Sequence, residues 1–161
     1  MPRNALRNGA VAVDPTIDAV DRRLLEELQA DGRLSVAELG RRVGLSPSAV
    51  AERVRRLEDD GVIRGYRADI DPRRLGYALG VVIRSRPAPR QLHAVAELAR
   101  RTPEVVLCHR VTGDDCFVML AHVRDVEHLE ELIDQFALYG QTTTSVIQSS
   151  PVPARPLVVP S

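Results

Sequence analysis

The first half of the chain contains two short capped helices joined by a tight turn. Ser35 and Glu38 have the spacing of a capping box, in which each side chain satisfies a free backbone amide of the other residue. Gly44 follows the first of these helices, where a glycine allows a left-handed cap. Ser46 can then cap another helix, with Pro47 at its first position. Two helices around such a turn predict a helix-turn-helix.

A further helix is expected before this pair. Residues 17–30 carry an apolar helical stripe, with Asp18 as the expected N-cap and Gly32 as the expected end. The last helix of the three should continue to about Asp60. The residues after it, 62–68, are expected to form a short strand or β-wing, so that the three helices belong to a winged helix-turn-helix domain.

The third helix has an apolar and a polar face. At about 100° per residue, Val50, Val54 and Leu57 share the buried side. The opposite side carries Ser48, Glu52, Arg55 and Asp59, with Arg56 beside them. Short polar groups near a helix start can approach base edges, and longer cationic side chains further along can reach phosphates. A solvated face of an ordinary helix is the alternative, but the capped helix and turn before it favour DNA.

The candidate contacts to double-stranded DNA follow from this placement. Arg41 and Arg42 of the preceding helix are expected to contact phosphates rather than bases. Arg53 lies closer to the buried side, so a structural or a phosphate-contacting role is open. The full set of candidates is Arg41, Arg42, Ser46, Ser48, Ala49, Glu52, Arg53, Arg55 and Arg56.

The charge of the chain supports DNA binding only locally. The 22 basic and 22 acidic residues cancel, so no global excess of positive charge argues for nucleic acid. All of the basic residues are arginine, which a GC-rich genome explains most simply. Residues 39–57, however, hold five arginines against one acid. Positive charge is therefore concentrated on the predicted helix-turn-helix.

Beyond residue 76 the pattern changes to alternating strands and helices. Strands are expected at residues 77–84, 105–111, 116–123 and 142–149. Amphipathic helices are expected at residues 91–101 and from a cap at Asp125. The order β-α-β-β-α-β predicts a ferredoxin-like domain and hence an α+β protein. The expected organisation is an arm (1–16), the winged helix-turn-helix (17–68), a linker (69–76), the ferredoxin-like domain (77–150) and a proline-rich tail (151–161).

At these residues the chain resembles the Lrp/AsnC, or feast/famine, family of transcriptional regulators. The resemblance is dense over LSVAELGRRVGLSPSAVAERVRRLEDDGVIRGYRADIDPRRLG (residues 34–76), and includes Ile17, Asp18 and Asp21 before it. It implies a DNA-binding regulator that dimerises through the sheet of its second domain and assembles into higher homo-oligomers. It also implies that an amino acid or a related small molecule binds to that domain and alters assembly or DNA affinity.

The same resemblance implies the effector-binding residues. The family's Gly-Asp-Tyr-Asp loop corresponds here to Gly113, Asp114, Asp115 and Cys116, so the tyrosine and the last aspartate are replaced. Two threonines separated by one residue match Thr142 and Thr144. An acidic loop and a hydroxyl cluster can bind the ammonium and carboxylate groups of an amino acid. Ordinary strand and turn roles for these residues remain the alternative.

Other classes of function find little support in the sequence. The alternative function is a metal- or small-molecule-binding regulatory module that acts without direct DNA contact. Candidate metal ligands lie close together in the sequence, namely Cys108, His109, Cys116, His122 and His128, but no pair has the usual ligand spacing. None of the common catalytic motifs is present, so no enzyme activity and no cofactor are expected. The absence of a long apolar run or a secretory signal, together with only two cysteines, favours the cytoplasm and no membrane association.

Overall fold

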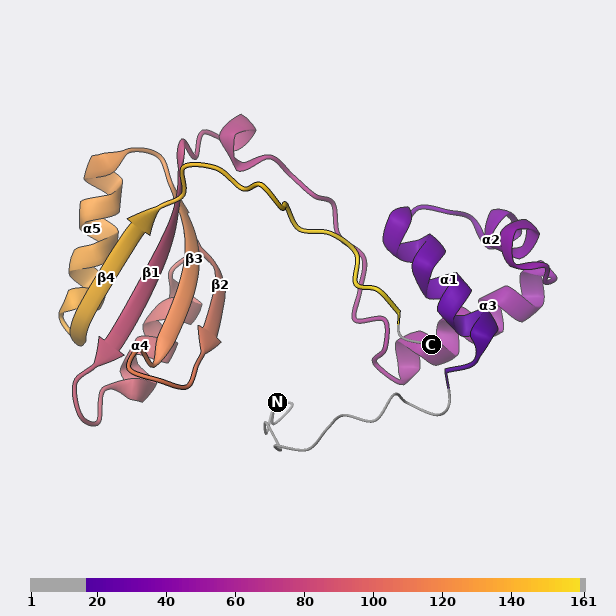
Figure 1. The fold of residues 1–161 in the computed structure, drawn as a ribbon, viewed down its shortest axis with the longest axis horizontal. Coiled ribbons are helices and arrows are strands. Elements are labelled where there is room, and N and C mark those ends of the chain that lie inside the picture. The colour runs from indigo at the N-terminus through magenta and orange to yellow at the C-terminus, as the bar shows by residue number, and fades with distance from the viewer. Residues whose placement is uncertain (1–16, 160–161) are drawn as a thin grey trace. The chain divides into compact units, whose positions relative to one another are not determined.

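The computed structural model describes residues 17–159, which divide into two compact units. Residues 17–68 belong to the first unit together with residues 152–159, and residues 69–151 form the second. The elements of each unit are labelled in Figure 1. No helix in the described part is long and apolar enough to cross a membrane.

Three helices form the first unit, and all three were predicted. They are α1 (Ala19–Ala30), α2 (Val36–Val43) and α3 (Pro47–Asp59). Their apolar stripes meet in a small core, whose fully or nearly fully buried residues are Leu24, Leu39, Val43 and Val50. Burial of these stripes stabilises the three helices, which would be too short to be stable in isolation.

The capping interactions differ from the prediction at one helix. Asp18 and Asp21 form the reciprocal capping box at α1: the Asp21 amide donates to Asp18 Oδ1 at 2.8 Å, and the Asp18 amide donates to Asp21 Oδ2 at 3.2 Å. At α2, Ser35 accepts from the Glu38 amide as expected. The Glu38 carboxylate, however, pairs with arginines one turn further along α2, so the predicted box is only half formed.

The turn between α2 and α3 is built around two glycines. Gly44 is left-handed (φ 76°), as its position after α2 predicts. Gly40 allows a close backbone approach, because a Cβ there would lie 2.6 Å from the carbonyl oxygen of Leu45. Ser46 caps α3 and Pro47 begins it. These residues determine how α3 leaves the turn.

The predicted strand at residues 62–68 is not formed. This segment has no strand partner among residues 17–159, and without a ladder of backbone hydrogen bonds it remains an irregular extended chain. It is anchored instead by Tyr66, whose hydroxyl donates to Glu58 Oε1 at 2.9 Å. Burial, together with this hydrogen bond, raises the pKa of Tyr66 to about 12. The prediction failed because a strand depends on a partner that local sequence does not specify.

The second unit has the predicted β-α-β-β-α-β order. After a short helix at Pro72–Leu75 (η1), its elements are β1 (Leu79–Pro87), α4 (Leu92–Arg101), β2 (Val105–Arg110), β3 (Phe117–Val123), α5 (Val126–Ala137) and β4 (Gly140–Val146). The strands form one antiparallel sheet in the order β2-β3-β1-β4. The observed β1 reaches three residues further than predicted, and β4 begins and ends earlier.

The two faces of this sheet differ. Alternate residues of β1 and β3, such as Val81 and Met119, are buried under α4 and α5, which pack on the same face. The residues between them, including Val82, Val118 and Leu120, lie on the other face, which no described element of this unit covers. The unit therefore has one packed face and one open, partly apolar face.

Candidate nucleic-acid interface and effector site

Helix α3 presents the face that the sequence predicts. Ser48, Glu52, Arg55 and Asp59 are exposed, whereas Val50 and Leu57 are buried. At the start of the helix, Ser46 Oγ accepts from the Ala49 amide at 3.3 Å and lies 3.1 Å from Ser48 Oγ. Residues along this helix line a shallow hollow of about 560 Å³, namely Ala49, Glu52, Arg53, Arg55, Arg56, Asp59 and Asp60.

Two of the candidate arginines are held by a buried carboxylate. Arg53 Nη1 lies 2.9 Å from Asp21 Oδ1, and Arg56 Nη2 lies 2.6 Å from Asp21 Oδ2. The Asp21 side chain is fully buried, and Arg53 also reaches Asp18 Oδ2 at 2.6 Å. The backbone amide of Asp21, followed by Arg53, lowers the pKa of Asp18, and the two aspartates raise the pKa of Arg53. This cluster fastens α3 to α1.

Asp21 is the functional residue that sequence reasoning missed. The sequence-based interpretation connects this residue with the family resemblance alone and gives it no structural role. A stronger signal was present, because Asp21 shares the apolar stripe with Ile17, Leu24 and Leu28. An acid on a buried face needs a basic partner, and Arg53 was already placed near the buried side of α3.

The arginines of α2 are also paired. Arg42 Nη1 lies 2.6 Å from Glu27 Oε2 of α1, and Arg42 Nε lies 3.0 Å from Glu38 Oε1. Arg41 pairs with the same Glu38 but its side chain remains 76% exposed. Arg55 has only a loose contact with Asp59, at 3.6 Å between two exposed side chains. Arg41 and Arg55 are therefore the candidate arginines most available to a phosphate.

The predicted effector loop lies at one end of β1. The Cys116 amide donates to the carbonyl of Ser85 at 3.0 Å. Arg86 donates from Nε to the carbonyl of Asp114 at 2.8 Å, and its Nη2 lies 3.3 Å from Asp114 Oδ1. Arg86 was not among the predicted residues. Since Asp114 is 94% exposed, its carboxylate remains accessible.

The two predicted threonines occupy the neighbouring strand. Thr142 pairs with Ser85, and Thr144 pairs with Ile83. Directly paired residues point to the same face of a sheet, so both threonines face the side covered by helices. Ser85 Oγ and Thr144 Oγ1 are buried without a hydrogen-bond partner. The loop and Thr142 thus meet at the same end of β1, but Asp114 and the threonine hydroxyls are not brought into direct contact.

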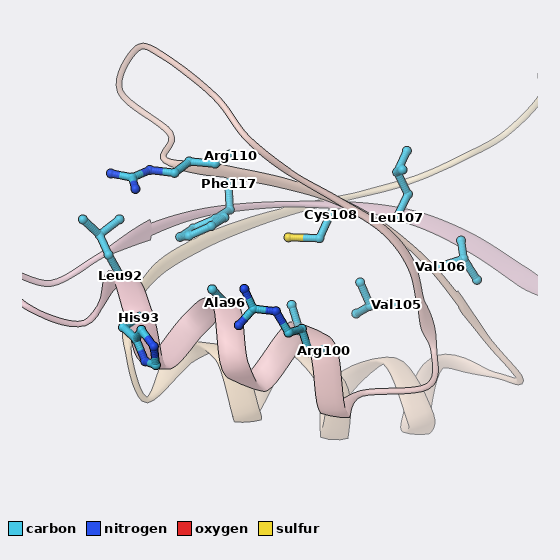
Figure 2. A pocket seen from close by; sticks show the side chains of 11 residues that line it. Leu92, His93, Ala96, Arg100, Val105, Val106, Leu107, Cys108, Arg110 and Phe117 are labelled. Carbon is cyan, nitrogen blue, oxygen red and sulfur yellow. The ribbon is translucent and has the colours of Figure 1, made fainter. Parts of the chain in front are cut away.

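A separate hollow of about 550 Å³ lies between α4 and β2 (Figure 2). Its walls are largely apolar, and Cys108 projects from β2 towards α4. Partial burial raises the pKa of the Cys108 thiol, whereas the pKa of a reactive cysteine is lowered. No sequence pattern predicted this hollow, since it depends on the spacing between a helix and an edge strand.

The residues considered for a metal site do not form one. Within residues 17–159, no group of three or more His, Cys, Asp or Glu side chains is placed to hold a metal ion.

Comparisons with known proteins agree with both units. Residues 17–58 match the AsnC-type helix-turn-helix domain, and residues 81–157 match the Lrp/AsnC ligand binding domain. The chain is 33% identical over 133 residues to the transcriptional regulator LrpC of Bacillus subtilis, covering 83% of this chain and 92% of that one. It is 35% identical over 150 residues to the leucine-responsive regulatory protein of Escherichia coli, covering 89% of this chain and 92% of the relative.

A solved structure has the same fold. A feast or famine regulatory protein from Mycobacterium tuberculosis, in complex with L-methionine, superposes with a TM-score of 0.84 at 35% identity. The match covers 89% of this chain and 99% of the other. The helix-turn-helix with its exposed α3 face, the ferredoxin-like sheet and these relatives together lead to one assignment. The chain belongs to the Lrp/AsnC family of transcriptional regulators.

Proposed function

We propose that the protein binds operator DNA through α3 and that an amino acid controls this binding. The exposed face of α3 carries the DNA proposal, because its polar residues project from a helix that Asp21 fastens to α1. Ser46, Ser48, Ala49 and Glu52 are the proposed base-proximal residues, and Arg41, Arg42, Arg55 and Arg56 the proposed phosphate contacts. Arg53, which is 28% exposed and paired twice, acts mainly as a positioning residue.

Fluorescence anisotropy with DNA from upstream of the protein's own gene, against scrambled DNA, tests this proposal over a salt series. Specific binding should favour the upstream DNA more than about tenfold and weaken with salt.

Arg55→Ala should lower affinity for all sequences and reduce the salt slope by about one. Glu52→Ala should instead relax the preference at individual base pairs. Arg101→Ala, an exposed arginine of α4, is the control and should change neither. Absence of any binding at low salt would refute the DNA assignment.

We further propose that the protein is a homodimer joined through the open face of its sheet and that dimers form higher homo-oligomers. Val82, Val118 and Leu120 make this face apolar next to the exposed Leu107. Paired sheets can bury such faces, and a symmetric dimer presents two α3 helices to a palindromic operator. The cytoplasm, where such DNA is accessible, is the proposed location.

For the effector we propose an amino acid, with L-methionine as the first candidate because a relative was solved with it. Gly113, Asp114 and Asp115 supply the acidic loop, which suits an ammonium group. Thr142 and Thr144 supply hydroxyls beside the unpartnered Ser85 Oγ, and these groups suit a carboxylate. A polar ligand would supply the hydrogen-bond partners that the buried hydroxyls of Ser85 and Thr144 lack.

Thr144→Val tests this effector site. The substitution removes a buried hydroxyl without a partner, so the ligand-free protein should become more stable by about 1 kcal/mol. The rise in melting temperature caused by L-methionine should at the same time be lost. Thr143→Val, on the exposed side of the same strand, is the control and should keep the methionine response. An unchanged response in Thr144→Val would place the effector elsewhere.

A further inference from the structure

The described part of the tail, residues 152–159, belongs to the DNA-binding unit rather than to the domain that precedes it in sequence. Its contact with that unit is made by Gln29 of α1. The Leu157 amide donates to Gln29 Oε1 at 2.8 Å, and Gln29 Nε2 donates to the carbonyl of Leu157 at 3.1 Å. One side-chain amide thus satisfies both backbone groups of one tail residue, as a neighbouring strand would.

The residue types suit this form of recognition. A carboxamide offers one donor group and one acceptor, whereas a carboxylate offers acceptors alone and an alanine offers neither. Pro151, Pro153 and Pro156 restrict the tail to extended conformations, so less conformational entropy is lost when it docks. The α1 surface at Gln29 is therefore suited to an extended, proline-containing segment.

The attachment of the tail to Gln29 is nevertheless weak. Leu157 is 80% exposed and Val158 is 90% exposed, so the docked tail buries little apolar surface. Two hydrogen bonds without such support leave docked and released forms close in free energy. Because the tail is tethered to the same chain, its effective concentration near α1 is high, and docking remains populated.

The tail also starts close to the proposed effector strand. Thr142 and Thr144 lie in β4, and the chain leaving β4 is held to β1 by the Ile147 amide, which donates to the Gly80 carbonyl at 2.8 Å. Only residues 148–151 separate this point from the tail. Helix α1, on which the tail docks, also carries Asp21, which pairs with two arginines of α3.

We propose that the tail is a latch: its docking on Gln29 gives the effector-binding domain a second connection to the DNA-binding unit, besides residues 69–76. Effector binding beside β4 biases the latch between docked and released forms and thereby changes how firmly α1 and α3 are held for DNA. This regulatory role rests on the proposed function, whereas docking of the tail on Gln29 does not.

Backbone amide exchange in the full-length protein tests the docking. The Leu157 amide should exchange at least threefold more slowly, relative to its intrinsic rate, than that of Val158, which has no partner in the described chain. Gln29→Ala removes both groups and should abolish this difference, whereas Gln29→Glu keeps an acceptor for the Leu157 amide but loses the donor to the Leu157 carbonyl, so it should reduce the difference. Gln135→Glu, the same change at an exposed position of α5, should preserve it. Equal protection of Leu157 in wild type and both Gln29 variants would overturn the docking.

DNA affinity with and without L-methionine tests the regulatory role. In both Gln29 variants the factor by which methionine changes the Kd should move towards one, whereas Gln135→Glu should retain the wild-type factor. An undiminished factor in both Gln29 variants would overturn the latch as a regulatory link. If the wild type itself does not respond to methionine, the proposed effector fails, and amide exchange still decides whether the tail docks.

Discussion

Asp21 is a buried carboxylate that serves two guanidinium groups at once. Its two oxygens are divided between Arg53 and Arg56, so each arginine is directed from α3 onto α1. A basic residue on a DNA-facing helix is usually interpreted as a phosphate contact. Here the pairing gives Arg53 and Arg56 a structural role, and their effect on DNA includes the placement of α3 itself.

Asp21→Asn should therefore destabilise the helical unit by about 2 kcal/mol, because Arg56 loses its charged partner and Arg53 loses one of its two, while the side chain keeps its size. The measurement is urea unfolding followed through the NMR amide signals of α1, α2 and α3. The matched control is Asp59→Asn, which removes only the exposed, loose pair with Arg55 and should change stability by less than about 0.5 kcal/mol. Equal effects of the two substitutions would contradict this role of Asp21.

Asp18 makes the stability of the same unit depend on pH. The Asp21 amide and Arg53 lower the pKa of Asp18 in the folded state below its ordinary value of 3.8. A depressed carboxyl pKa stabilises the fold above the unfolded-state value, and this contribution is lost as the pH falls through the folded-state value. Its loss therefore belongs to the acid side, below the ordinary aspartate pKa.

Asp18→Asn isolates this charge, since asparagine can still cap α1. At pH 7 the variant should unfold at a lower urea concentration than wild type, and the two curves should converge as the pH drops below the ordinary aspartate value of 3.8. Asp69→Asn changes an exposed carboxylate that makes no hydrogen bond or ion pair within residues 17–159, and this variant should follow wild type throughout. A gap that persists unchanged at low pH would show that the carboxylate charge is not the cause.

At the scale of the elements, the turn between α2 and α3 determines the position of the DNA-facing helix. Gly40 lies inside α2, where alanine would normally favour the helix by about 1 kcal/mol. In this structure its missing Cβ leaves room for the carbonyl of Leu45. The close contact is with backbone, so a side-chain rotation cannot relieve it.

Gly40→Ala should thus destabilise the helical unit by about 1–3 kcal/mol and weaken DNA binding, in spite of its better helix propensity. Gly44→Ala is the informative comparison, because a Cβ there meets no atom but the residue is left-handed. In Gly44→Ala we expect backbone strain to lower the free energy of unfolding by about 1–2 kcal/mol. DNA binding should be less affected than in Gly40→Ala. Unfolding and anisotropy on both variants check this, and a stabilised Gly40→Ala protein would contradict the close approach.

Elements that depend on local signals were predictable from the sequence. The caps at Asp18, Ser46 and Asp125 and the left-handed Gly44 all lie where their residue types place them. Features that depend on distant partners were missed. Arg56 and Asp21 are 35 residues apart in sequence, and Gln29 and Leu157 are 128 apart. Neither pair leaves a periodic pattern in the sequence. The prediction of a strand at residues 62–68 was wrong for the same reason, because a strand also depends on a distant partner.

At the scale of the whole molecule, the open face of the sheet decides the proposed assembly. Leu120 pairs with Leu107 on one side and with Val82 on the other, so it lies near the middle of the apolar part of this face. Leu120→Glu should place a charge in the proposed interface, convert dimers to monomers and lower DNA affinity at least about tenfold through loss of bivalent binding.

Analytical ultracentrifugation and anisotropy measure these two effects. Leu138→Glu makes the same chemical change at a residue that is 82% exposed and lies outside the open face. That control should remain a dimer with wild-type DNA affinity. A Leu120→Glu protein that stays dimeric would place the dimer contact on another surface.

The return of the tail to α1 also has a consequence for synthesis of the protein. The DNA-binding unit is discontinuous in sequence, and the whole effector-binding unit is inserted between its two parts. During translation the inserted unit is complete, and free to fold, before the residues that contact Gln29 have left the ribosome. A nascent chain can thus acquire its effector domain first, and its DNA-binding unit gains the contact at Gln29 only after that domain has been synthesised.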